Sequence, residues 1–69
     1  MEIRQIHTFV QVARLGSFSK AAEMLGYSQS AVTVQIRLLE TELETRLFDR
    51  MGKKISLTTQ GTQFYEHCN

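Results

Sequence analysis

The stretch SFSKAAEMLGYSQSAVTVQIR, Ser17 to Arg37, decides the fold. It reads as two helices joined by the turn Gly26-Tyr27-Ser28. Glycine supplies the left-handed conformation that ends helices, and serine is a preferred residue at a helix start. Two adjacent alanines in the first helix allow a second helix to cross closely, and small polar residues open the second helix. This layout is typical of a helix-turn-helix that reads DNA, here spanning Phe18 to Arg37.

The residues before this stretch predict another helix, over residues 3–14. One apolar face follows a spacing of three, four and three residues, and two further apolar residues widen it. The face consists of Ile3, Ile6, Val10 and Ala13, widened by Phe9 and Val12. Gly16 is expected to end this helix and Ser17 to cap the next one.

The second helix of the stretch is expected to run from its cap at Ser28 to about Glu44. At 100° per residue, one narrow sector collects the core residues Val32, Ile36, Leu39 and Leu43. The opposite face collects Ser30, Thr33, Val34, Arg37 and Thr41. The later half carries three glutamates, Glu40, Glu42 and Glu44, which we interpret as a solvated side. Contact with a phosphate backbone is therefore expected only from the earlier half.

Residues 47–57 no longer show helical spacing. Apolar residues alternate there with polar ones around a glycine, which is typical of a β-hairpin. We predict a small β-hairpin with Met51-Gly52-Lys53 near its tip. Thr58 is then expected to cap a last helix. The order of helix, helix, helix, hairpin and helix predicts a mainly α, winged helix-turn-helix domain over residues 1–58, with residues 59–69 beginning a linker helix.

Composition narrows the class further. The 69 residues are 42% hydrophobic and 22% charged, which suits one soluble domain. The net charge of +1 is weak support for a nucleic-acid partner, so the placement of the charges has to carry that argument. The single cysteine excludes an internal disulfide, and no apolar run approaches membrane-spanning length. The early charges argue against a signal peptide, so we expect a cytoplasmic protein.

The residues at the start of the long helix fit the chemistry of base recognition. Glutamine bonds adenine through two hydrogen bonds, hydroxyl groups bond several bases, and an apolar side chain contacts the thymine methyl group. These roles are predicted for Gln29, for Ser30 and Thr33, and for Val34. Arg37 is suited to a phosphate or a guanine. The expected hairpin adds Arg50, Lys53 and Lys54 near the DNA backbone or minor groove.

Motifs along nearly the whole chain resemble the N-terminal domain of LysR-type bacterial transcriptional regulators. The matching residues are Ile3-Arg4-Gln5-Ile6, Phe9, Val12-Ala13, Gly16 through Ala22, Leu25, Gln29 through Thr33, Gln35-Ile36, Leu39-Glu40, Leu43, Leu47 through Arg50, Leu57-Thr58 and Gly61. Each piece alone is weak, but all of them in register over one domain form a specific signal.

The resemblance implies sequence-specific binding of double-stranded DNA by a repressor or activator. It also implies a homodimer formed through the helix that begins at Thr58, often assembled into a tetramer. A small-molecule inducer is implied only for a C-terminal domain that these residues do not include, and no cofactor is expected here. The family's base-reading positions correspond to Gln29, Ser30, Thr33 and Val34. Val34 departs from the family, which commonly has arginine or another polar residue there.

Other interpretations of the same residues stay open. Gln35 lies on the flank of its helix and is either structural or a phosphate contact. Arg50 could hold the wing through an ion pair, and lysines at a hairpin tip are usually just solvated. A different class of function is a small helical protein-interaction module that docks a partner through Ser30, Val34 and Arg37. We find no metal-ligand spacing and no catalytic constellation, so no enzyme is expected.

Overall fold

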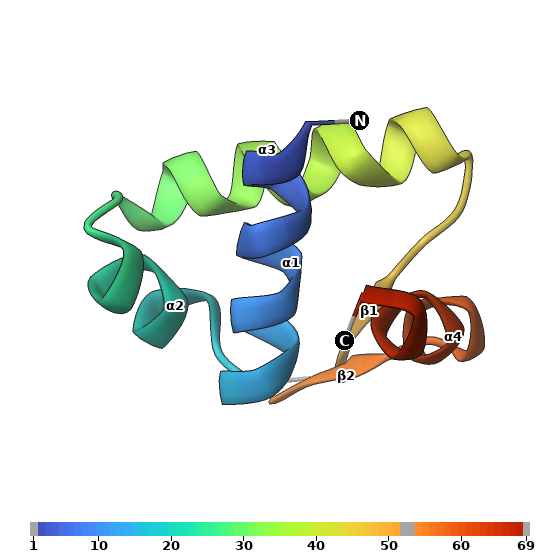
Figure 1. Cartoon of the computed structure of the whole chain (residues 1–69). Helices are drawn as coiled ribbons and strands as arrows, with labels where there is room; N and C mark the ends of the chain where they lie inside the picture. The colour runs from blue at the N-terminus through green and yellow to red at the C-terminus, as the bar shows by residue number, and fades with distance from the viewer. Residues whose placement is uncertain (1, 52–53, 69) are drawn as a thin grey trace.

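The computed structural model describes residues 2–51 and 54–68. Its elements are α1 (Ile3–Leu15), α2 (Phe18–Leu25), α3 (Gln29–Leu43), β1 (Phe48–Met51), β2 (Lys54–Leu57) and α4 (Thr59–Cys68). Helix α1 crosses α3, α2 lies near the N-terminal end of α3, and α4 lies beside the hairpin (Figure 1). This arrangement confirms the predicted winged helix-turn-helix fold.

Local capping sets the helix boundaries where the sequence predicted them. Gly16 and Gly26 adopt left-handed conformations with φ of 65° and 75°, and end α1 and α2. The Ser17 hydroxyl accepts a hydrogen bond from the Lys20 amide, at 3.1 Å. The Ser28 hydroxyl accepts one from the Ala31 amide in the same way, at 3.2 Å. These bonds satisfy amide groups that the first turn of a helix leaves without partners.

The end of α3 is different, because a non-glycine residue takes the left-handed conformation there. Glu44 has φ of 54° and is the C-cap of α3. For a residue with a Cβ this conformation costs about 1–2 kcal/mol. The connector, residues 44–47, therefore begins at a strained position.

The core gathers apolar residues from the helices, the connector and β1. Its buried members are Phe9, Val12, Phe18, Ala21, Ala22, Val32, Ile36, Leu39, Leu47 and Phe48. The Phe9 ring lies at the centre, with its centroid 5.3 Å from that of Phe48 and 5.1 Å from that of Phe64. Tilted ring pairs at such distances add stability beyond their buried area. Phe9 and Phe48 are thus core residues, and Phe64 packs against them from α4.

The buried face of α1 differs from the one predicted. Phe9 and Val12 are fully buried and Thr8 is buried with them, whereas Ile3 is 86% exposed. Spacing alone assigns a whole helix face to the core, but Ile3 is the first residue of the helix and lies beyond the packed part. Phe9 and Val12, which were predicted only to widen the apolar face of α1, lie at the centre of its buried face.

The hairpin forms as predicted, with antiparallel pairing of Phe48 with Leu57, Asp49 with Ser56, Arg50 with Ile55, and Met51 with Lys54. Phe48 turns into the core, and Ile55 and Leu57 pack half-buried against it. The predicted tip residues Gly52 and Lys53 lie outside the described residues.

Helix α4 lies very close to the connector. A Cβ built on Gly61 would lie 2.1 Å from the Leu47 carbonyl oxygen, so only glycine fits there. The Thr58 hydroxyl accepts a hydrogen bond from the Gly61 amide at 2.9 Å, which confirms Thr58 as the cap of α4. Thr58 also donates its amide to the Leu47 carbonyl and its hydroxyl to the Arg46 carbonyl. The start of α4 is therefore fixed to the connector.

Candidate nucleic-acid interface

The N-terminal half of α3 presents the predicted reading residues on the surface. Gln29, Ser30 and Arg37 are exposed, Thr33 is half-buried, and Val34 is 52% exposed although it is apolar. These five residues define what we call the reading face. The core residues Val32, Ile36 and Leu39 occupy the other side of α3 and hold it against α1 and α2.

Hydrogen bonds on the reading face determine which groups remain available to a ligand. The Thr33 hydroxyl donates its proton to the Gln29 carbonyl at 3.1 Å, so its outward lone pairs can only accept. An acceptor there suits the exocyclic amine of adenine or cytosine in the major groove. The Ser30 hydroxyl lies 3.2 Å from that of Ser28, which is occupied as the cap.

Gln35 is separated from the reading face and serves the fold instead. The Thr8 hydroxyl donates to the Gln35 side-chain oxygen at 2.6 Å, joining α1 to α3. Thr8 is only 1% exposed, so this bond satisfies polar atoms at the junction of the two helices. Of the two interpretations of Gln35, the structure supports the structural one.

Glu40 corrects the interpretation of the acidic half of α3 as a solvated side. Its carboxylate oxygen Oε2 accepts hydrogen bonds from the amides of Leu47 and Phe48, at 2.8 and 3.3 Å. An ionised acceptor makes such bonds stronger than neutral ones. Glu40 therefore fixes the start of the wing to α3, a contact across seven residues of chain that helix spacing could not reveal.

The basic residues predicted for the wing are placed by its backbone. Arg50 lies in β1 opposite Ile55, and Lys54 opens β2 opposite Met51. Lys53 lies outside the described residues. The hairpin begins at the segment that Glu40 holds, so the start of the wing is fixed next to α3.

A shallow groove of about 260 Å³ lies between α3 and the start of the wing. Its lining combines residues of α2, α3, the connector and β1, namely Phe18, Thr33, Ile36, Arg37, Glu40, Arg46 and Phe48. Arg46 was not among the predicted site residues. The only signal for it in the sequence is a basic residue directly before the apolar pair Leu47-Phe48.

Two negative findings concern the described residues. They contain no group of three or more histidine, cysteine or acidic side chains arranged to hold a metal ion. Within the same ranges, no helix has both the length and the apolar character that crossing a bilayer requires.

Comparison with known proteins agrees with this geometry. The sequence profile of the bacterial regulatory helix-turn-helix proteins of the lysR family matches residues 3–62. The HTH-type transcriptional regulator YwqM of Bacillus subtilis (strain 168), an uncharacterized protein, is 47% identical over 68 residues. That match covers 99% of this chain but 23% of YwqM, so the chain spans about a quarter of the length of such a relative.

Solved structures show the same fold. A crystal structure of the BenM DBD in complex with catB site 1 DNA matches with a TM-score of 0.94 and 37% identity, covering 99% of this chain and 76% of that one. The CbnR DBD in complex with DNA matches with a TM-score of 0.94 and 38% identity, covering 99% and 78%. The chain belongs to the LysR family of bacterial regulatory helix-turn-helix proteins.

Proposed function

We propose that this chain binds double-stranded DNA in a sequence-specific manner and regulates transcription from promoter or operator sites. The observation that carries the proposal is the reading face, exposed at the N-terminal half of α3 beside a two-stranded wing. An α-helix fits the major groove, where each base pair presents a distinct pattern of donors and acceptors. The likeness to BenM and CbnR domains bound to DNA supports the same use.

In this proposal the residues of the reading face and of the wing make different kinds of contact with DNA. Gln29, Ser30 and Thr33 form hydrogen bonds with base edges, and Val34 packs on a thymine methyl group. Arg37 contacts a phosphate or a guanine. Arg50, Lys53 and Lys54 of the wing supply salt-dependent contacts to the backbone or minor groove.

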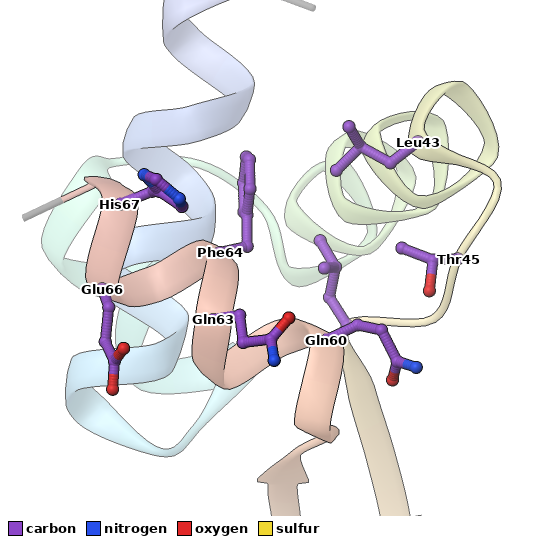
Figure 2. A pocket seen from close by; sticks show the side chains of 8 residues that line it. Leu43, Thr45, Gln60, Gln63, Phe64, Glu66 and His67 are labelled. Atoms are coloured by element: carbon purple, nitrogen blue, oxygen red, sulfur yellow. The ribbon is translucent and has the colours of Figure 1, made fainter.

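We also propose that two copies pair through α4. A groove of about 540 Å³ lies between the end of α3, the connector and α4. In it, Leu43 and Thr45 face the α4 side chains Gln60, Gln63 and Phe64 (Figure 2). Phe64 and Tyr65 already pack against Phe9, so the surface available to a partner is this groove side of α4. Pairing would set two copies of α3 in successive major grooves, about 34–36 Å apart. Tetramers are proposed for the longer protein.

The remaining proposals concern the setting of this activity. The domain acts in the cytoplasm, by binding and not by catalysis, and uses no cofactor of its own. A small-molecule inducer would bind a C-terminal domain like the one that the family carries. The relatives that match are named transcriptional regulators, which supports a regulatory role.

The test is selection of bound duplexes from a random-sequence library, followed by anisotropy titration of the selected duplex at two salt concentrations. We expect one enriched motif and affinity that falls steeply with salt. Thr33→Ala should relax the motif, whereas Lys53→Ala should weaken every duplex alike. No enrichment together with salt-independent binding would favour the protein-interaction module instead.

A further inference from the structure

The groove between α3 and the wing contains two arginines from separate segments. Arg37 comes from the reading face, and Arg46 comes from the connector that leads into β1. A neighbouring hollow is lined by the same two arginines together with Glu40, Thr41, Glu44 and Thr45. Residues nine positions apart in sequence thus border one continuous depression.

Neither arginine pairs with a carboxylate of the described residues. Glu40 shares the groove, but its Oε2 atom accepts from the Leu47 and Phe48 amides. The Oε2 atom of that carboxylate therefore holds the connector, and no hydrogen bond of either guanidinium group to another described residue is found. A guanidinium presents a rigid fork of N–H donors that matches a phosphate group.

We propose that Arg37 and Arg46 together bind one backbone phosphate of the DNA in this groove. The inference rests on the proposed function and deepens it by assigning a phosphate site to a residue outside both the reading face and the wing. If α3 enters the major groove and the wing lies over the adjacent backbone, one strand must pass between them. The groove lies at that position, and phosphate contacts there would fix the register of the reading face.

Glu40 is a positioning residue in this arrangement. Its two hydrogen bonds hold the backbone on the C-terminal side of Arg46, and the Thr58 hydroxyl holds the Arg46 carbonyl at 2.6 Å. The Arg46–Leu47 peptide group is thereby fixed at both its carbonyl and its amide before DNA arrives. A preformed site loses less conformational freedom on binding than a mobile one.

The test measures binding of the 69-residue protein to a duplex of scrambled sequence across a series of salt concentrations. Phosphate contacts act on any sequence, so no operator needs to be known. Arg46→Gln should weaken binding roughly fivefold at low salt and reduce the salt slope by about 0.9. The control is Arg14→Gln, which removes the same charge from a side chain bonded to Gln11 on α1, away from the groove. The control should leave both quantities near those of the wild type.

A double variant tests whether the two arginines share one phosphate. If they do, Arg37→Gln combined with Arg46→Gln should lose less affinity than the product of the two single losses, because each change already breaks the same clamp. Losses that multiply would overturn the shared site. Equal behaviour of Arg46→Gln and Arg14→Gln, with wild-type binding intact, would overturn the phosphate contact alone. Salt-independent or absent binding by the wild type would instead overturn the proposed function.

Discussion

The two ends of α3 differ in exposure: the N-terminal end is open to solvent, and the C-terminal end is held by packing and hydrogen bonds. The N-terminal end presents the reading face, where Gln29 and Ser30 are exposed and the apolar Val34 is 52% exposed. The C-terminal end is anchored, because Leu39 is fully buried and Glu40 bonds the amides that open the wing. A helix can therefore expose binding groups at one end when packing and hydrogen bonds at the other end fix its position.

The largest expected effect comes from the contact that fixes the connector to α4. Gly61→Ala would force a Cβ against the Leu47 carbonyl oxygen, so we expect a loss of about 3 kcal/mol in the free energy of unfolding. In an ordinary helix the same change stabilises by about 0.5–1 kcal/mol, so the sign itself is the test. Chemical denaturation measures it, with Thr59→Ala, at an exposed residue outside the pairing groove, as the control. A stabilised Gly61→Ala variant would mean that α4 is not seated on the connector.

Removing the Glu40 carboxylate should have the next largest effect. Glu40→Ala leaves the Leu47 and Phe48 amides without their acceptor, which should cost about 1.5–3 kcal/mol of stability. Glu23→Ala removes an exposed glutamate from α2 and should change stability by less than about 0.5 kcal/mol. Thermal and urea unfolding of the two variants compare them directly. Equal stabilities would show that the anchored end does not depend on Glu40.

A substitution at Glu44 should stabilise the domain, unlike the two changes above. Glu44→Gly should stabilise the domain by about 1 kcal/mol, because glycine adopts the left-handed conformation without the Cβ penalty. Glu23→Gly removes the same charge inside α2 and should destabilise by about 1 kcal/mol. Urea midpoints should therefore move in opposite directions for the two variants. A shift in the same direction would contradict the strain assigned to Glu44.

Substitutions on the reading face should change the free energy of unfolding very little. Gln29→Ala and Thr33→Ala remove no buried contact, so each should change unfolding free energy by less than about 0.5 kcal/mol. On a selected DNA site the same variants should lose about 1–3 kcal/mol of binding free energy. Paired unfolding and anisotropy measurements give both numbers. A large stability loss without a binding loss would place these residues in the fold, not in the interface.

Much of the fold follows from local chemistry that a sequence displays. The caps at Ser17, Ser28 and Thr58 and the left-handed glycines at Gly16 and Gly26 were all predicted, since each depends on residues within one turn. The core face of α3 was predicted from the 100° spacing. The hairpin was predicted from alternation around a glycine.

The errors and omissions concern contacts between distant segments. The buried face of α1 was displaced because the centre of the face depends on where neighbouring helices cross, not on spacing within α1. Thr8 with Gln35, and Glu40 with the connector, are joined by hydrogen bonds that span 27, seven and eight residues. No periodicity in the chain marks either pair.

The helix ends, the hairpin, the order of elements and the polar residues at the start of α3 all follow from the sequence, because capping and amphipathic spacing act over a few residues. Which polar residues hydrogen-bond within the fold, and which remain exposed, depends on the packing of the elements against one another. The crossing of α1 and α3 joined Gln35 to Thr8. The path of the connector joined Glu40 to Leu47, set Leu47 against Gly61 and put Arg46 in the groove that Arg37 lines. The physical reason is that such contacts depend on the relative placement of rigid elements, which only the packing of the whole core sets.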